Sequence, residues 1–173
     1  MSIFKLRGLQ AASQGDGSGR LGRLFALCAL VFLTALPAGA AVSVQPFTRT
    51  GWTDLQQAES GRAVVVFSST DCAHCPGVIR TLAGEIARAG RPVRLHVVVL
   101  DGAGQEAHLQ DDPVYRLAHR LHVVTDEELP VRHAVNPAWH GLTPYVVFLV
   151  PGRTPAYHLG LPPATVRQRF FRP

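Results

Sequence analysis

The chain has 173 residues, which is the size of one domain, so its length gives no reason to expect a second core. Its formal net charge is +5 at pH 7, but residues 1–40 hold four basic residues and one acidic residue, which leaves +2 for the remainder. No segment of that remainder clusters Arg with aromatic residues, so we expect no nucleic-acid partner.

The N-terminal segment has the pattern of an export signal. Arg20 and Arg23 precede an apolar run at residues 24–36, and small residues follow. The run is shorter than the roughly 20 apolar residues of a membrane-spanning helix. We expect cleavage after Ala40, with retention of the segment as a membrane anchor as the alternative.

The sequence therefore predicts two parts, a signal peptide at 1–40 and one domain at 41–173. We expect the domain in the periplasm or another extracytoplasmic compartment, held at the inner membrane only if the signal is retained. Disulfides persist in such oxidising compartments. Cys28 lies in the apolar run as filler, which leaves Cys72 and Cys75 as the two cysteines of the domain.

Helix and strand patterns alternate in the first half of the domain. A short amphipathic helix is expected at 53–60, and the continuous apolar run at 63–67 is typical of a strand buried on both faces of a parallel sheet. Apolar residues at helical spacing after Cys75 predict a helix that stops at Gly90. A second buried strand at 93–100 completes a strand, helix, strand unit, which implies parallel strands.

The segment at 101–141 has the least regular pattern. It predicts one helix at 113–122. A further short helix is expected to start at Thr125, because Thr125 and Glu128 have the spacing of a capping box, with Pro130 disrupting it soon afterwards.

The C-terminal part predicts two strands and a helix. The strands are expected at 145–150 and 156–159, joined by a turn at Pro151, and the helix at 163–171. Together the patterns predict an α/β fold with a central mixed sheet of four to five strands and helices on both faces.

The pair Cys72 and Cys75 carries the predicted chemistry. The two residues are three positions apart, so their sulfurs can close a small disulfide. At the start of a helix, unsatisfied N–H groups and the macrodipole stabilise a thiolate, which is the nucleophilic form. We therefore expect Cys72 at the exposed first turn to attack and Cys75 to resolve, with their redox-active disulfide serving in place of any other cofactor or metal.

Two neighbouring side chains are expected to tune this pair in opposite directions. His74 favours the thiolate of Cys72, which stabilises the reduced form and makes the couple more oxidising. Asp71 disfavours a second negative charge beside the sulfur. The direction of electron flow stays open.

The same pair is compatible with two other uses. Two cysteines at this spacing can form half of a zinc site, for which His119 and His122 on one predicted helix are the best additional ligands, although solvated surface imidazoles explain them as well. A purely structural disulfide is disfavoured, because so small a loop constrains the unfolded chain little.

The order of these motifs resembles the thioredoxin family. The strand at 63–67, the Cys72-Ala73-His74-Cys75-Pro76 turn, the following helix and the stretch at 142–148 carry this resemblance over most of residues 52–171. It implies a thioredoxin fold with a helical insertion before the cis-proline strand. It also implies a cis bond at Thr143-Pro144, opposite the cysteines, where the two residues hold the backbone of an extended substrate.

The sequence departs from the family pattern at three places. Val66 stands where many members bury a carboxylate, and Asp71 stands where an aromatic residue often precedes the first cysteine. The segment at 101–141 is longer than its equivalent in a minimal thioredoxin. A proton relay and the apolar docking platform are therefore both expected to differ.

The resemblance implies an exported thiol–disulfide oxidoreductase that exchanges disulfides with protein thiols and has a membrane redox partner. His74 and Thr143 resemble the oxidising branch of the family, so oxidase or isomerase activity is slightly favoured over reductase activity. The alternative is a metal-binding module or metallochaperone that holds copper(I) or zinc with the same two cysteines. A third possibility is an interaction protein whose disulfide is idle.

Overall fold

The fold is that of a computed structural model, which describes residues 42–172. These residues belong to one unit of the chain, Ala41–Pro173. The predicted signal or anchor segment and Cys28 lie outside the described residues. Within the described part, no helix combines the length and the apolar character needed to cross a membrane.

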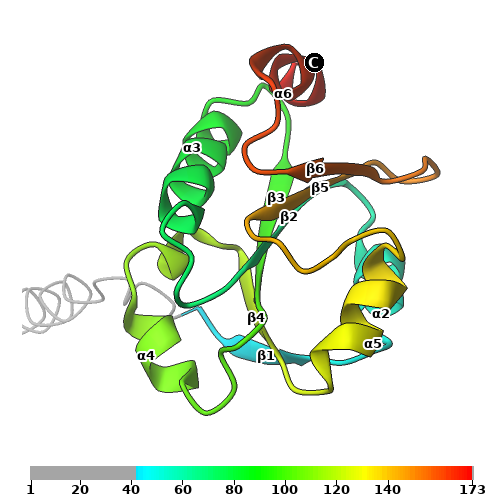
Figure 1. The fold of residues 1–173 in the computed structure, drawn as a ribbon. Helices are drawn as coiled ribbons and strands as arrows, with labels where there is room; N and C mark the ends of the chain where they lie inside the picture. The colour runs from blue at the N-terminus through cyan, green and yellow to red at the C-terminus, as the bar shows by residue number, and fades with distance from the viewer. Residues whose placement is uncertain (1–41, 173) are drawn as a thin grey trace, which may run out of the picture. The chain divides into compact units, whose positions relative to one another are not determined.

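A mixed sheet forms the centre of the domain, and within residues 42–172 its six strands lie in the order β1-β4-β3-β2-β5-β6 (Figure 1). The strands are β1 (Val44–Phe47), β2 (Arg62–Ser68), β3 (Val93–Val99), β4 (Arg120–Val124), β5 (Tyr145–Leu149) and β6 (Ala156–Leu159). The first four in this order are parallel, and β5 and β6 are antiparallel to their neighbours. The predicted mixed sheet is confirmed, but four to five strands was too low a number, because β1 and β4 were missed.

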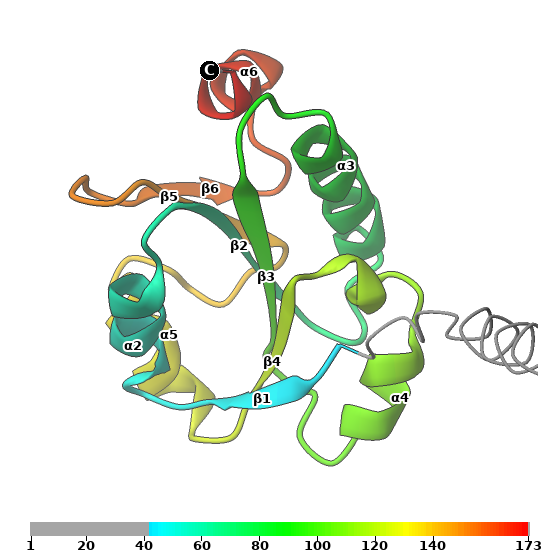
Figure 2. The ribbon, with the colours of Figure 1, turned by 180° about the vertical axis from the view of Figure 1, so that it is seen from behind.

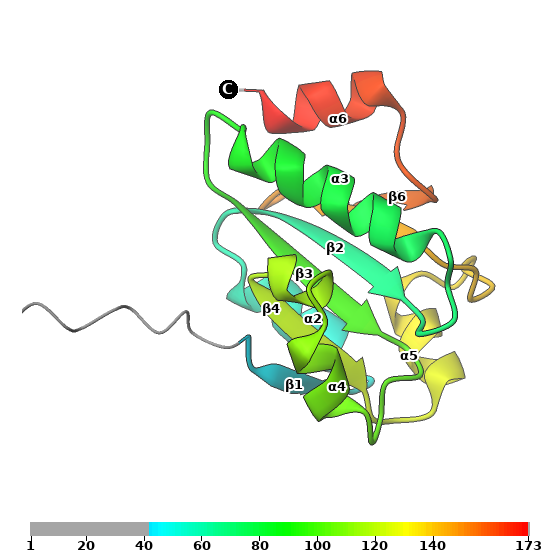
Figure 3. The same ribbon diagram turned by 90° about the vertical axis from the view of Figure 1, so that its left-hand side faces the viewer.

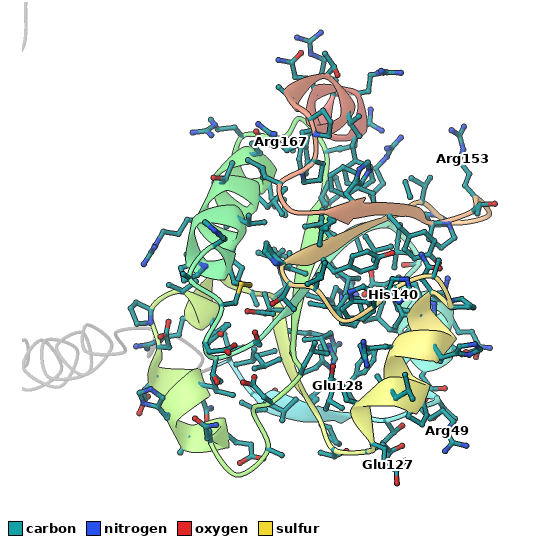
Figure 4. All side chains as sticks on the ribbon, viewed as in Figure 1. Arg49, Glu127, Glu128, His140, Arg153 and Arg167 are labelled. Carbon is teal, nitrogen blue, oxygen red and sulfur yellow. A yellow bond between two sulfur atoms is a disulfide. The ribbon has the colours of Figure 1, made fainter. Side chains whose placement is uncertain are left out.

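Helices cover both faces of the sheet, as predicted. One face is covered by α2 (Gly51–Ala58) and α5 (Glu128–Val135), and the other by α3 (Cys75–Ala87), α4 (Glu106–Asp111) and α6 (Ala164–Phe171), as the two opposite views show (Figures 1 and 2). A 3-10 turn, η1 (Tyr115–Leu117), follows α4. The ion pair between Arg167 and Glu85, at 3.0 Å, ties α6 to α3 (Figure 4).

The central strand β2 is buried on both faces, which explains its unbroken apolar run. Val64 and Val66 pack into the core beneath α3, whereas Val65 and Phe67 pack into the core beneath α2 and α5. Successive side chains of a strand point to opposite faces, so a strand covered on both sides needs apolar residues at every position. Both β2 and β3 therefore occur where the sequence predicted them.

The predicted helix at 113–122 is wrong. The chain forms η1 there and then enters β4, which pairs with both β1 and β3. Leu121 and Val123 alternate into the core beneath α3, while Val124 packs into the opposite core. This two-residue period was obscured by the charged and imidazole side chains between the apolar ones, so the pattern was misread as helical.

The predicted capping box before α5 is also wrong. The helix begins at Glu128, and Thr125 lies before it. Asp126 instead accepts a hydrogen bond from the backbone N–H of Arg49 at 2.9 Å. Pro130 does not disrupt α5, because it lies in the first turn, where a backbone N–H has no partner within the helix.

The carboxyl ends of the parallel strands meet at one end of the sheet. Figure 3 shows the arrowheads of β2, β3 and β4 pointing towards the end at which α3 begins. The loops that follow β2 and β3 therefore lie side by side there. The helical insertion predicted before the cis-proline strand is confirmed, since α4, η1 and α5 lie within the segment at 101–141, although the individual helices differ from those predicted.

Candidate active site

A disulfide joins Cys72 to Cys75 at the start of α3, with an S–S distance of 2.08 Å and a Cα–Cα distance of 5.4 Å. It is the yellow bond in Figure 4. Cys75 is the first residue of α3 and is only 1% exposed, whereas Cys72 lies in the preceding turn and is partly exposed. The prediction that Cys72 occupies the first helical turn is therefore corrected by three residues. Cys72 is nevertheless the sulfur that solvent or a substrate can reach.

Backbone hydrogen bonds fold the loop before α3 into tight turns. The N–H of Cys72 donates to the carbonyl of Ser69 at 3.3 Å, and the N–H of Cys75 donates to the carbonyl of Cys72 at 3.2 Å. Pro76 occupies the first turn of α3, where its missing N–H costs nothing. The disulfide consequently lies at the positive end of the helix dipole, which favours a negative charge on sulfur once the bond is reduced.

A carboxylate at the end of β3 clamps the same loop. Asp101 accepts hydrogen bonds from the backbone N–H of Thr70 at 2.8 and 3.1 Å and from its hydroxyl at 2.6 Å. The two residues come from the neighbouring loops after β2 and β3. Sequence reasoning missed this clamp, although carboxyl ends of adjacent parallel strands are where such side chains meet.

The segment before β5 faces the disulfide loop. Because β2 and β5 are antiparallel and Phe67 pairs with Tyr145, the residues after β2 and those before β5 lie at the same end of the sheet. The Thr143-Pro144 peptide bond is cis, the isomer that the resemblance implied. The hydroxyls of Ser69 and Thr143 are hydrogen-bonded at 3.1 Å, which joins the two loops directly.

Exposed leucines border the cis-proline loop. Leu142 is 63% exposed, and Leu159 and Leu161 are also exposed. The N–H of Gly160, between the last two, donates to the carbonyl of Pro144 at 2.8 Å, so these leucines lie on the same side of the disulfide as the proline. Trp139 stabilises the loop, because its indole N–H donates a hydrogen bond to the carbonyl of Leu142 at 3.0 Å.

The two predicted tuning residues are exposed and differ in their contacts. Asp71 accepts a hydrogen bond from the hydroxyl of Ser69 at 2.8 Å, so Ser69 links Asp71 to Thr143. His74 is the residue immediately before α3, and its imidazole does not cap the helix. Ser69 was not predicted, and the sequence held no signal for it beyond its place in the loop.

The position of the missing carboxylate is filled by the core. Val66 is completely buried beneath α3 with Ile79 and Val146. Two residues after Val66 on β2, the hydroxyl of buried Ser68 contacts the hydroxyl of Tyr115 at 3.4 Å. This hydroxyl pair is contributed by β2 and η1, and Tyr115 lines the same cavity as Cys72.

His119 and His122 do not lie together. The imidazole Nδ1 of His119 accepts a hydrogen bond from the backbone N–H of Leu95 at 3.0 Å, at the start of β4. His122 is buried on the opposite face of the sheet, where its Nε2 lies 3.3 Å from Nδ1 of His96. Among the described residues, no group of three or more His, Cys, Asp or Glu side chains is arranged to hold a metal ion.

The buried imidazole pair is joined to a carboxylate. Nε2 of His96 lies 3.0 Å from Oε1 of Glu59, which Arg94 also contacts at 3.3 Å. Burial, together with the positive potential of His96 and Arg120, lowers the pKa of His122 to about 4. Burial also lowers the pKa of His96, against the opposing effect of Glu59. Both rings are therefore neutral at pH 7 and serve packing on this face of the sheet.

The sheet order, the two helical layers and the cis-proline loop define a thioredoxin fold. No family model and no curated protein matches the sequence. Among solved structures, the chain is similar to the thioredoxin domain of a thiol–disulfide oxidoreductase from Bacteroides vulgatus, with a TM-score of 0.50 and 14% identity over 61% of this chain and 75% of that one. This likeness confirms the fold.

Two structures from Mycobacterium tuberculosis are also similar. DsbF, in its mixed oxidised and reduced forms, gives a TM-score of 0.48 and 15% identity over 67% of this chain and 82% of that one. A secreted disulfide oxidoreductase described as homologous to E. coli DsbE gives a TM-score of 0.44 and 17% identity over 62% of this chain and 74% of that one.

Proposed function

We propose that the protein is an exported thiol–disulfide oxidoreductase that exchanges disulfides with protein thiols. The observation that carries this proposal is the disulfide between an accessible Cys72 and a buried Cys75, at the positive end of α3 and beside the cis-proline loop. A structural disulfide needs no accessible sulfur, whereas an exchanging one does. The thioredoxin fold shared with a known thiol–disulfide oxidoreductase supports the same function.

In the proposed reaction Cys72 is the attacking residue and Cys75 the resolving residue. When the reduced protein meets a substrate disulfide, the Cys72 thiolate bonds to one substrate sulfur and the other leaves as a thiolate. Cys75 then attacks Cys72, which releases the second substrate thiolate and closes the Cys72–Cys75 disulfide. Two electrons pass to the substrate, and the reverse sequence oxidises a substrate dithiol.

The substrate is proposed to lie along the cis-proline loop. The backbone of Thr143, beside Pro144, offers hydrogen-bonding groups to an extended chain, and exposed Leu142 adds apolar contact. In this role Leu142 takes the place of the aromatic platform that is missing at Asp71. Because backbone bonds and a single leucine impose little side-chain selection, this side suits many protein substrates.

The direction of exchange is proposed to be oxidation or isomerisation. His74, exposed next to Cys75, favours the reduced form by stabilising negative charge on Cys72. Asp71 opposes this effect, but its carboxylate is already bonded by the Ser69 hydroxyl. We place the domain outside the cytoplasm because of the signal pattern at 1–40. We further propose that a membrane redox partner restores its oxidation state and that the cysteine pair is its redox group.

The reduction potential of the full chain tests this function. A reversible two-electron couple is expected, and a reduction potential of about −120 mV would mark an oxidase, whereas one of about −270 mV would mark a reductase. Metal analysis of the same sample addresses the metallochaperone alternative. A protein that carried stoichiometric copper or zinc on Cys72 and Cys75, or showed no reversible couple, would overturn the proposal.

A further inference from the structure

A cavity lies on the other side of the disulfide from the cis-proline loop. It has a volume of about 290 Å³ and separates the disulfide loop from the segment that contains α4 and η1. Its walls include Cys72 and Pro76 on one side and Gln105, His108, Asp112 and Tyr115 on the other. Thr143 and Pro144 are not part of the lining, so the cavity is distinct from the proposed backbone-binding side.

A single carboxylate supplies the formal charge of this cavity. The described residues that line it include Asp112 but neither Arg nor Lys. Oδ1 of Asp112 accepts hydrogen bonds from the backbone N–H groups of Val114 at 2.7 Å and Tyr115 at 3.4 Å. These bonds fix the side chain through Oδ1, and Oδ2 accepts no hydrogen bond from the described residues.

The negative potential extends into the cavity. The pKa of Tyr115 is raised, first by burial and then by the carboxylates of Asp112 and Asp101, with its hydrogen bond to Ser68 acting in the opposite direction. Tyr115 lines the cavity, so the field of these carboxylates acts on a group inside it. A positive charge placed there would be stabilised by the same field.

The shape of the cavity limits what it can hold. A volume of about 290 Å³ is at the lower end of small-molecule sites, which suits one side chain and some water rather than a cofactor. Cys72 forms part of the wall. When a substrate cysteine is bonded to its sulfur, the residues next to that substrate cysteine therefore lie close to the cavity.

We propose that this cavity binds a basic side chain, Lys or Arg, next to the reacting cysteine of a protein substrate, and that Asp112 selects its charge. The proposal rests on the proposed function and adds a substrate class to it. The cis-proline loop then holds the backbone of the substrate, while the segment with α4 and η1 discriminates between side chains.

Small disulfides of opposite charge provide the test. The reduced full-length protein is mixed at low ionic strength with cystamine, which carries two ammonium groups, with 3,3′-dithiodipropionate, which carries two carboxylates, and with uncharged 2-hydroxyethyl disulfide. In each case Cys72 attacks one probe sulfur, one probe thiolate leaves, and Cys75 releases the second. Each rate is divided by the rate with dithiothreitol, an uncharged dithiol, which corrects for the different leaving groups.

We expect the corrected rate with cystamine to exceed that with 3,3′-dithiodipropionate by about tenfold, the effect of one charge-assisted hydrogen bond. Asp112→Asn should reduce this preference to about twofold, because Asn keeps the acceptor for Val114 and Tyr115 but loses the charge. Asp111→Asn is the matched control, since Asp111 is exposed and does not line the cavity, and it should keep the full preference.

The outcomes separate the two proposals. If none of the three disulfides oxidised the reduced protein faster than it oxidised dithiothreitol, the proposed function itself would be refuted. Normal reaction with the uncharged probe but equal corrected rates for both charged ones would refute the basic-side-chain site. Equal losses of preference in the Asp111 and Asp112 variants would refute it too, because a general surface field, and not the cavity, would then account for the preference.

Discussion

The two sides of the disulfide differ in chemistry. On one side the cis-proline loop presents backbone groups and exposed leucines, and it is joined to the disulfide loop through the hydroxyls of Ser69 and Thr143. On the other side a cavity is lined by polar side chains and by the carboxylate of Asp112. In our proposal the first side accepts almost any extended chain, whereas the second distinguishes charges. The difference suggests how one reactive cysteine combines broad binding with selection.

Loss of the attacking sulfur has the largest expected effect, because both sides act only through Cys72. A Cys72→Ser protein should show no exchange above the uncatalysed rate with protein or small disulfides, measured by stopped-flow under pseudo-first-order conditions. Cys28→Ser is the matched control and should react at the wild-type rate. Retention of exchange in Cys72→Ser would show that neither side serves the reaction that we assign to it.

Acid should weaken the fold through the buried imidazole pair, which is separate from both sides of the disulfide. His122 has a pKa of about 4 in the folded domain and an ordinary value of 6.5 when unfolded, so the unfolded state binds more protons between these values. Stability therefore falls as the pH falls from 6.5 towards 4, by about 3 kcal/mol for this group. His96, whose pKa is also lowered, acts in the same direction.

Denaturant unfolding at pH 7 and pH 4.5 measures this loss, and a His122→Gln protein should lose less stability over the same range. The charge preference of the exchange reaction, measured where the protein remains folded, should not follow the titration of His122, because that residue lies on the α2 face of the sheet. A preference that changed in step with His122 would connect the buried pair to the site and contradict this separation.

Leu142→Asp should impair the apolar side selectively. Loss of one large apolar contact corresponds to roughly 1.5 to 3 kcal/mol, so kcat/KM for a protein substrate should fall by about tenfold or more, while small disulfides react at the wild-type rate. Leu129→Asp is the matched control, because Leu129 is 67% exposed on α5. Equal effects on protein and small disulfides would mean that Leu142 acts on the cysteines and not on substrate docking.

Removal of the Asp101 clamp should have the smallest effect. Asp101→Ala leaves the N–H and hydroxyl of Thr70 without their shared acceptor, but both groups are exposed to water. We expect the free energy of unfolding to fall by about 1 kcal/mol, with Asp111→Ala close to the wild type. Calorimetry or urea unfolding measures the change, and no difference between the two variants would show that the clamp does not stabilise the loop.

The strands and helices around the cysteines were predictable from local pattern. β2 and the end of β3 are continuous apolar runs because both of their faces are buried, and α3 has apolar residues at helical spacing because one of its faces is buried. The resemblance to the thioredoxin family added what local pattern could not, namely that the residues around Thr143 face Cys72. Pairing of β2 with β5 is a long-range contact with no local signal.

The segment at 101–141 was not predictable in the same way. Strand β4 includes two residues with polar side chains, Arg120 and His122, and the latter is buried only because His96 and Glu59 lie next to it. The cavity beside Cys72 depends on the packing of α4 and η1 against the disulfide loop, which is a tertiary feature. Ser69 and Asp101 could be suspected from their places after β2 and β3, but their partners could not.

The pH dependence of alkylation of the reduced full-length protein tests the central claim most directly. Our account predicts that, of the two cysteines of the domain, Cys72 reacts rapidly with iodoacetamide, with a midpoint between about 3.5 and 7.5, while buried Cys75 stays largely unmodified. A midpoint at the ordinary value of about 8.5, or equal modification of Cys72 and Cys75, would contradict it.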